Sequence, residues 1–241
     1  MMEILAVVPA RGGSKALPGK NIAPFAGKPL IAWSVEAGLA SDLVTRTIVT
    51  TDDAAIAAAG LLAGAEVPFE RPAELAEDHV RDLPVFVHAL AWLDEHEGYR
   101  PDLVVQLRPT SPIRPPGIID EAIDKLIAHP EADSLRSVCL AGVTPYKMWR
   151  IEGEVLVPVA ESGVPEQHDA PRQTLPEVYL HNGLIDVIRP ATITELGSMS
   201  GRVIVPFVVD PELDVDIDDQ ASLDWAVRRA DALGFGTTEA P

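Results

Sequence analysis

Short apolar runs alternate along the chain with stretches in which apolar residues recur every three or four positions. The run Ile4 to Val8 has no polar interruption, which is typical of a strand buried on both faces of a parallel sheet. Further strands are predicted at residues 46–51, 66–69, 103–106, 134–140, 184–187 and 202–208. Ile31, Val35 and Leu39 show the helical spacing. Helices are predicted at residues 30–39, 54–63, 117–128 and 222–233, and in the stretch that carries Val85, Leu90 and Trp92. The alternation favours an α/β fold with a doubly wound, mostly parallel sheet.

Residues 143–177 do not follow this alternation. Apolar side chains at and near Trp149, Ile151 and Val155 predict short antiparallel strands that stand apart from the layered core. So small an excursion cannot bury its own apolar side chains, and a partner surface is expected to cover them. We therefore predict one domain over residues 1–233, with the excursion at 143–177 and a flexible tail at 234–241.

The composition narrows the class of protein. The 241 residues, 47% of them hydrophobic, suit one substantial globular domain. The formal net charge of -18 argues against nucleic acid and against anionic membranes as partners. Cys139 is the single cysteine and cannot form an intramolecular disulfide, which suits a reducing compartment. Neither a leader segment nor an apolar run of the roughly 20 residues that span a bilayer is recognised. We expect a cytoplasmic protein.

A basic, glycine-rich loop follows the first predicted strand, at residues 10–21. Chain leaving such a strand lies at the carboxyl edge of the sheet, where open α/β sheets bind ligands. The loop carries three glycines and three cations, namely Gly12, Gly13, Gly19, Arg11, Lys15 and Lys20. We interpret it as a phosphate-holding loop, with a solvated surface loop as the alternative. The spacing matches neither GxxxxGK[ST] nor GxGxxG, which disfavours a P-loop NTPase and a dinucleotide dehydrogenase.

An acidic segment near the end of the chain is the second chemical centre. In an extended segment Asp214, Asp216 and Asp218 would lie on one side, where paired carboxylates suit Mg²⁺. Asp219 is instead expected to cap the helix that follows. Asp52, after the second strand, is interpreted as a cap or turn former rather than a ligand.

Several stretches resemble motifs of one family. They are PARGGSKALPGKNI at residues 9–22, RPAEL at 71–75, LRPTSPIR at 107–114, PRQTLP at 171–176, Asn182-Gly183 and VDID at 215–218. In this order they resemble the CMP-sialic acid synthetases, the acylneuraminate cytidylyltransferases. The resemblance implies a Rossmann-like nucleotidyltransferase fold and a Mg²⁺-dependent homodimer. It also implies that CTP and an acidic nine-carbon sugar, a nonulosonic acid, are converted to the CMP-sugar and pyrophosphate.

The resemblance also implies roles for individual residues. Nucleotide binding falls to Arg11, Gly12, Gly13, Ser14, Lys15, Lys20, Asn21, Arg71, Val80 and Asp82. Sugar binding falls to Arg108, Thr110, Ser111, Lys147, Arg172, Gln173, Tyr179 and Asn182, with a solvent-facing position as the alternative for Lys147. Asp216 and Asp218 would hold Mg²⁺, and Arg11 and Lys20 would join them in catalysis. The excursion would form the dimer interface and lean over the partner's site. A metal-bound hydroxide and Asp218 are both open as the general base.

Two positions depart from the family pattern. Arg108 stands where the family has a glutamine that faces the sugar, and Asp82 stands where members often carry a hydroxyl. An arginine can hold a carboxylate through two hydrogen bonds, so Arg108 either retains an acidic sugar with an altered fit or marks a different sugar. Legionaminic and pseudaminic acids, Kdo and sugar phosphates are alternative substrates. A catalytically silent sugar-nucleotide sensor and a purely structural subunit are alternatives of other classes.

Overall fold

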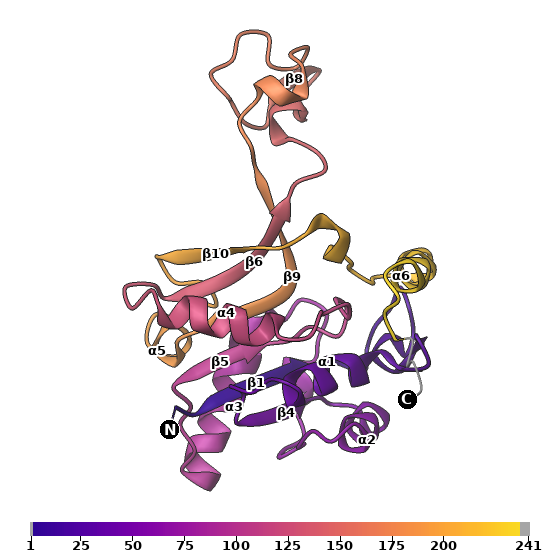
Figure 1. Ribbon diagram of the computed structural model, residues 1–241, viewed down its shortest axis with the longest axis vertical. Helices are drawn as coiled ribbons and strands as arrows, with labels where there is room; N and C mark the ends of the chain where they lie inside the picture. Colours follow the sequence, from indigo (N-terminus) through magenta and orange to yellow (C-terminus); the bar gives the residue numbers. More distant parts are fainter. Residues whose placement is uncertain (1, 237–241) are drawn as a thin grey trace.

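The computed structural model describes residues 2–236, which contain a six-stranded sheet in the order β10-β6-β9-β5-β1-β4 (Figure 1). Its strands are β1 (Ile4–Pro9), β4 (Arg46–Thr50), β5 (Leu103–Gln106), β6 (Ser134–Leu140), β9 (Tyr179–Ile188) and β10 (Ile204–Val208). β1 pairs in parallel with β4 and β5, and β10 with β6, whereas β9 runs antiparallel between β5 and β6. The mostly parallel sheet predicted from the sequence is confirmed.

One predicted strand is wrong. Residues 66–69 do not form a strand, because Glu66 makes just an isolated parallel bridge to Ile48. Pro68 has no backbone N–H to continue a ladder, so the chain leaves the sheet edge there and turns towards Arg71. The strand predicted at residues 184–187 is in turn the end of the longer β9, which starts at Tyr179.

Helices lie on both faces of the sheet. They are α1 (Leu30–Leu39), α2 (Ala54–Leu62), α3 (Asp82–Glu97), α4 (Ile118–Ile127), α5 (Pro190–Thr194) and α6 (Gln220–Ala232). Short 3₁₀ turns are η1 (Lys20–Ile22), η2 (Ala73–Leu75), η3 (Pro145–Lys147), η4 (Arg172–Thr174) and η5 (Pro211–Leu213), and β2 (Pro24–Phe25) pairs with β3 (Lys28–Pro29). The helices predicted from apolar spacing are confirmed to within two residues at each end.

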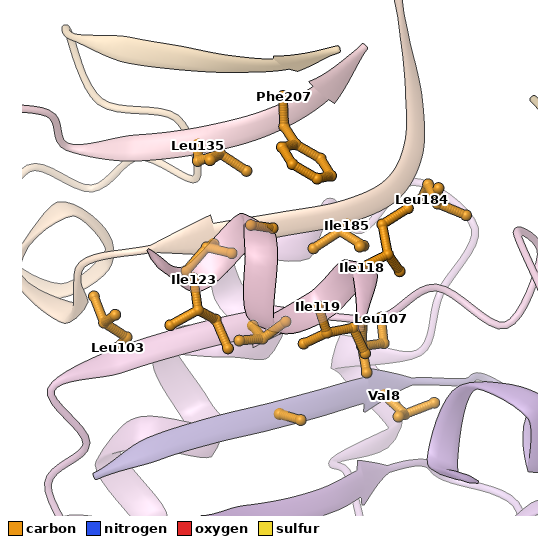
Figure 2. Close-up of a cluster of buried hydrophobic side chains, with 14 of the residues drawn as sticks. Val8, Leu103, Leu107, Ile118, Ile119, Ile123, Leu135, Leu184, Ile185 and Phe207 are labelled. Atoms are coloured by element: carbon orange, nitrogen blue, oxygen red, sulfur yellow. The ribbon is translucent and has the colours of Figure 1, made fainter. Parts of the chain in front are cut away.

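The side chains of β1 alternate between two hydrophobic clusters. Ile4, Ala6 and Val8 belong to a cluster that includes residues of α1 and α4, whereas Leu5 and Val7 belong to a cluster that includes residues of α3. Figure 2 shows α4 side chains of the first cluster over the sheet. A strand that is buried on both faces needs an uninterrupted apolar run, which explains the sequence pattern at Ile4 to Val8.

The excursion leaves the sheet between β6 and β9 and projects away from it, at the top of Figure 1. Its strands β7 (Trp149–Glu152) and β8 (Val155–Pro158) pair antiparallel, as the sequence predicts. Apolar side chains on this hairpin face solvent, and Ile151 is 77% exposed. Trp149 stacks on His168 with ring centroids 3.5 Å apart. The dimerisation role of the excursion stays a prediction.

The described part of the predicted tail packs against the domain. The ring of Phe235 lies 4.5 Å from that of Trp33, centroid to centroid, and its backbone N–H donates to the carbonyl of Ala230. A flexible tail was predicted from Gly234 onward, but Phe235 holds this segment in an apolar cluster with Phe25. The rest of the predicted tail, residues 237–241, lies outside the described residues. Across residues 2–236, no helix combines the length and apolarity needed to cross a membrane.

Candidate active site

The candidate site lies at the carboxyl edge of the parallel strands. β1 and β5 end there together, since Val7 is in register with Gln106. The basic loop follows β1, and the segment 107–114 follows β5. β9 runs the other way, so the part of it near Asn182, just before its pairing with β5 begins at Asp186, reaches the same edge. Three segments that are far apart in the sequence therefore converge, as expected at the ligand-binding edge of an α/β sheet.

The basic loop is anchored on the end of β4. The backbone N–H of Gly12 donates to Oδ1 of Asp52 over 2.9 Å. A Cβ atom on Gly12 would lie 2.8 Å from Cβ of Asp53, so a side chain would not fit at this position. Asp53 caps α2 by accepting from the backbone of Ala55 and Ile56. Asp52 was interpreted as a cap or turn former; the cap is Asp53, whereas Asp52 follows β4 and accepts from the basic loop.

The cations of the loop are held by acidic residues from other segments. Nη1 of Arg11 lies 2.6 Å from Oδ1 of Asp78, and Lys15 pairs with the same carboxylate. The hydrogen bonds from Lys15 and Arg11 lower the pKa of Asp78 below its ordinary value. Nζ of Lys20 lies 3.1 Å from Oδ1 of Asp218, which brings the basic loop and the acidic segment together.

A cavity of about 200 Å³ collects many of the predicted nucleotide-binding residues. Its lining includes Arg11, Lys20, Asn21, Arg71, Val80, Asp82, Arg108 and Thr110. Asn21 is buried and donates through Nδ2 to the carbonyl of Arg11 over 3.0 Å, which fixes the start of the loop. Gly12, Gly13, Ser14 and Lys15 belong to the adjoining loop rather than to the lining. Around Gly13, no described atom lies within 4 Å of where a Cβ would be, so a ligand can approach its backbone closely.

Arg71 is a buried arginine in the wall of this first cavity. It is 4% exposed and donates from Nη2 to the carbonyl of Thr50 over 2.5 Å and from Nε to Thr50 Oγ1 over 3.2 Å. Burial lowers its pKa to about 10. No carboxylate among residues 2–236 lies within ion-pair distance of its guanidinium. Arg71 is therefore a buried cation in a cavity wall rather than a surface ion-pair residue.

Arg108 joins two carboxylates beneath the site. Its Nη1 lies 2.7 Å from Oδ2 of Asp186, and its Nη2 lies 3.0 Å from Oδ2 of Asp82. Gln106 Nε2 also donates to Asp82, over 2.7 Å, and Arg136 Nη1 lies 2.8 Å from Asp186. The Asp186 side chain is fully buried, which alone would raise its pKa. Its hydrogen bond from His181 and the charges of Arg108 and Arg136 outweigh burial, so the pKa is lowered.

A second cavity, of about 430 Å³, adjoins the first at Arg108. Its lining comprises Arg108, Ser111, Leu180, His181, Asn182, Gly183, Asp214 and Asp216. Oδ1 of the buried Asn182 accepts from Ser137 Oγ over 2.7 Å, while its Nδ2 has no hydrogen-bond partner within the described chain. Gly183 has a φ of +68°, and a Cβ there would lie 3.3 Å from Nη1 of Arg108. This glycine therefore makes room for the arginine.

The acidic segment alternates as predicted. Val215 and Ile217 are buried at 1% and 0% exposure, and Asp214 and Asp216 line the second cavity. The backbone N–H of Ile217 donates to the carbonyl of Thr110. Burial and the charge of Asp218 raise the pKa of Asp216, against a hydrogen bond with the Thr110 side chain. Asp219 caps α6 in a capping box with Ser222, as predicted.

The two aspartates do not form a complete metal site on their own. Within residues 2–236, no three His, Cys, Asp or Glu side chains converge as a metal-binding group. Asp216 and Asp218 nevertheless lie close enough for their charges to interact. This pair fits Mg²⁺, which takes few protein carboxylates and completes its shell with water and substrate phosphates.

Four predicted sugar-binding residues lie away from both cavities. Arg172 donates from Nη1 to the carbonyl of Gly142 over 2.6 Å and from Nη2 to that of Ala141, and with Gln173 it lines a separate cavity of about 470 Å³. Lys147 ends η3 on the excursion. Tyr179 is exposed and its hydroxyl lies 3.4 Å from Oε2 of Glu177. The fold of one chain does not bring these residues to Arg108.

The sequence patterns missed several residues of the site. Arg114 is buried and donates to the carbonyls of Leu184 and Arg108 and to Ser34 Oγ, which ties the segment after β5 to β9 and α1. Burial lowers its pKa to about 9. Asp186, Arg136 and His181 were also missed. The available signal was a lone carboxylate, Asp186, within the apolar run that ends β9.

The chain belongs to the cytidylyltransferase family, whose model matches residues 5–159. It is 42% identical over 123 residues to the CMP-N,N'-diacetyllegionaminic acid synthase of Legionella pneumophila, a match that covers 51% of this chain and 53% of the relative. It is 30% identical over 230 residues to the N-acylneuraminate cytidylyltransferase of Escherichia coli O18:K1:H7, covering 93% of this chain and 51% of the relative. The matches thus span about half the length of these curated relatives.

Solved structures confirm the fold. The structure of a CMP:2-keto-3-deoxy-manno-octonic acid synthetase complexed with CTP superposes with a TM-score of 0.68 and covers 96% of this chain and 99% of that one. The sequences are 18% identical, so the likeness concerns the arrangement of sheet and helices. The α/β nucleotidyltransferase architecture predicted from the sequence is therefore confirmed.

Proposed function

We propose that this protein transfers CMP from CTP to the anomeric hydroxyl of a nonulosonic acid and releases pyrophosphate. The observation that carries the proposal is the meeting of Lys20 and Asp218, 3.1 Å apart although 198 positions separate them. This contact places a basic loop and a pair of carboxylates beside two adjoining cavities. Nucleotidyl transfer needs all of these parts: cations on the phosphates, carboxylates for a metal ion, and separate places for nucleotide and acceptor.

The first cavity is the proposed CTP site. Arg11, Lys15 and Lys20 carry the charge that the triphosphate requires, and the open space at Gly13 lets phosphate oxygens reach backbone N–H groups. Arg71 provides a buried cation for the cytidine, whose carbonyl accepts hydrogen bonds. The names of the relatives, which are cytidylyltransferases and CMP-sugar synthases, support CTP as the nucleotide.

The second cavity is the proposed sugar site. The unpaired Nδ2 of Asn182 and the hydroxyl of Ser111 provide polar groups for a sugar. Arg108 places positive charge beside the carboxylate expected of a nonulosonic acid. Two of its nitrogens are engaged by Asp82 and Asp186, so Arg108 acts as a fixed charge rather than a mobile clamp. The names of the legionaminic and neuraminic relatives support this class of sugar.

Asp216 and Asp218 would hold the Mg²⁺ that we propose as cofactor. When bound, the ion supplies charge neutralisation at the reacting phosphate. Lys20 holds Asp218 in place within the same group of charges. Asp216 is held by Thr110, whose segment follows β5.

We further propose that two copies of the chain assemble. The exposed apolar hairpin of the excursion is the surface that a second copy would cover. Arg172 and Gln173, which lie away from Arg108 in their own chain, would then reach the sugar site of the partner. Light scattering would give the mass of a dimer, and Ile151→Asp would reduce it to that of one chain.

Pyrophosphate release tests the function directly. The four nucleoside triphosphates are crossed, with Mg²⁺, against sialic, legionaminic and pseudaminic acids, Kdo and simple sugar phosphates. Release with CTP and a nonulosonic acid is expected. Release with another triphosphate or with a sugar phosphate would contradict the proposal. Tight binding of CTP without release across the panel would instead indicate a sensor.

A further inference from the structure

We propose that His181 is the general base that deprotonates the sugar hydroxyl, with Asp186 as its positioning residue. This inference rests on the proposed function and assigns the one role that the motifs leave open. His181 lies in the wall of the proposed sugar cavity, together with Arg108 and Asp216. Its side chain is 41% exposed, so it contacts both the cavity and the buried carboxylate behind it.

The hydrogen bond to Asp186 determines which nitrogen of the imidazole carries the proton. Nε2 of His181 lies 3.0 Å from Oδ1 of Asp186. An ionised carboxylate only accepts hydrogen bonds, so Nε2 must be the donor and the neutral ring keeps its lone pair on Nδ1. Nδ1 has no hydrogen-bond partner in the part of the chain that the structure describes. It is therefore available as a proton acceptor.

The irregular backbone of β9 makes this pair possible. In a regular strand, residues five positions apart point to opposite faces, so His181 and Asp186 would not meet. Here the pairing of β6 with β9 shifts register between Arg136 and Val138, and Gly183 between the two residues has a positive φ of 68°. The bulge turns His181 towards the face of Asp186.

Asp186 is held ionised and immobile. It accepts from Arg108 Nη1 and Arg136 Nη1 through Oδ2, at 2.7 and 2.8 Å, which leaves Oδ1 for His181. Arg136 Nη1 also lies 3.4 Å from His181 Nε2. Asp214 and Asp216 also line this cavity, and Asp82 is paired with Arg108. Positive and negative groups therefore both surround the imidazole.

The anomeric hydroxyl gives its proton to Nδ1 of His181 while its oxygen forms a bond to the α-phosphorus of CTP. The bond from that phosphorus to the bridging oxygen breaks, and pyrophosphate leaves with the electron pair. His181 then releases the proton to solvent. An imidazole is a stronger base than an aspartate near neutral pH, and this role leaves Asp216 and Asp218 to the metal ion.

The test compares His181→Gln with the unsubstituted protein and with His129→Gln. Glutamine can still donate to Asp186 but cannot take up a proton. His129 lies just after α4, away from both cavities, and its Nδ1 is 2.8 Å from the carbonyl of Lys125, so it serves as a matched control. With CTP and the sugar identified by pyrophosphate release, His181→Gln is expected to lower kcat about 10²- to 10⁴-fold. The KM for CTP should change less than about twofold. The fall of kcat/KM at acidic pH should disappear in this variant alone.

The outcomes separate this inference from the function on which it rests. Failure of the unsubstituted protein to release pyrophosphate with any sugar overturns the proposed function. If the protein is active and its His181→Gln variant keeps both its kcat and the fall of kcat/KM at acidic pH, the base assignment alone is overturned. A raised KM for the sugar at unchanged kcat also overturns it, because His181 would then bind sugar without accepting a proton.

Discussion

The two cavities that meet at Arg108 are built in different ways. The proposed nucleotide cavity adjoins the basic loop, whose Arg11 and Lys15 are paired with the partly exposed Asp78. The sugar cavity is built over Asp186, a fully buried carboxylate that joins β5, β6 and β9 through charged hydrogen bonds. Buried charge networks tolerate little change, whereas exposed ion pairs contribute little to stability. The difference predicts that substitutions on the two sides have effects of unequal size and kind.

The largest effect is expected from Asp186→Asn. This change leaves Arg108 and Arg136 without their shared buried partner and should lower the free energy of unfolding by about 3–5 kcal/mol. Urea denaturation followed by circular dichroism measures it. Asp78→Asn is the matched control. It removes an ion pair that is partly exposed to solvent and contributes little stability, so its unfolding midpoint should hardly change. Equal losses in the two variants would contradict the contrast between buried and exposed networks.

Asp218→Asn should affect turnover rather than folding. The substitution removes a charge from the proposed metal pair at constant shape, and a loss in kcat of about 10²- to 10³-fold is expected from one missing group that stabilises charge. Steady-state pyrophosphate release against Mg²⁺ concentration would show it, with an unchanged unfolding midpoint. Near-normal turnover would remove Asp218 from the metal site.

Arg108 lines both cavities, and Arg108→Gln should change sugar binding more than nucleotide binding. It removes the contacts to Asp82 and Asp186 and the positive charge beside the sugar cavity. We expect the order of preference among acidic sugars to change, with a rise in sugar KM of roughly tenfold, since about 1–3 kcal/mol follows from one hydrogen bond to a charged group. The KM for CTP should change much less. Weakened CTP binding at an unchanged sugar profile would move Arg108 to the nucleotide site.

The smallest effect is expected from Asp78→Asn on nucleotide binding. Arg11 and Lys15 would no longer be paired, and the KM for CTP should fall about two- to fivefold, as suits an exposed pair worth under about 1 kcal/mol. The pKa of Asp78 is lowered, so its ion pairs are present above the ordinary carboxyl pKa and are lost only as the pH falls through the lowered value. The fall in the KM for CTP should therefore be constant from pH 6 to 8, and it should become smaller as salt is added. A raised KM would show that Asp78 helps to hold the nucleotide.

The sequence allowed much of the fold and one half of the site to be predicted. The apolar run of β1, the helical spacings and the loop at residues 10–21 are local patterns, and each appeared where it was predicted. The strand expected at residues 66–69 does not form, because Pro68 lacks the backbone N–H that pairing with a neighbouring strand requires. The partners of Arg108 could not be predicted, because Asp82 and Asp186 reach it from α3 and β9 only through the packing of the sheet. His181 was missed for a related reason. Its contact with Asp186 depends on a β-bulge in β9, and no repeating pattern in the sequence indicates that bulge.

The base of the excursion is a direct continuation of β6 and β9. Cys139 pairs with Leu180, Leu140 pairs with Tyr179, and the N–H of Ala141 donates to the carbonyl of Val178. β9 carries His181 and Asn182 two and three residues after Tyr179. One continuous strand, β9, therefore connects the base of the hairpin to the wall of the proposed sugar cavity. We therefore expect a displacement of the hairpin to move, through β9, the side chains that line the proposed sugar cavity.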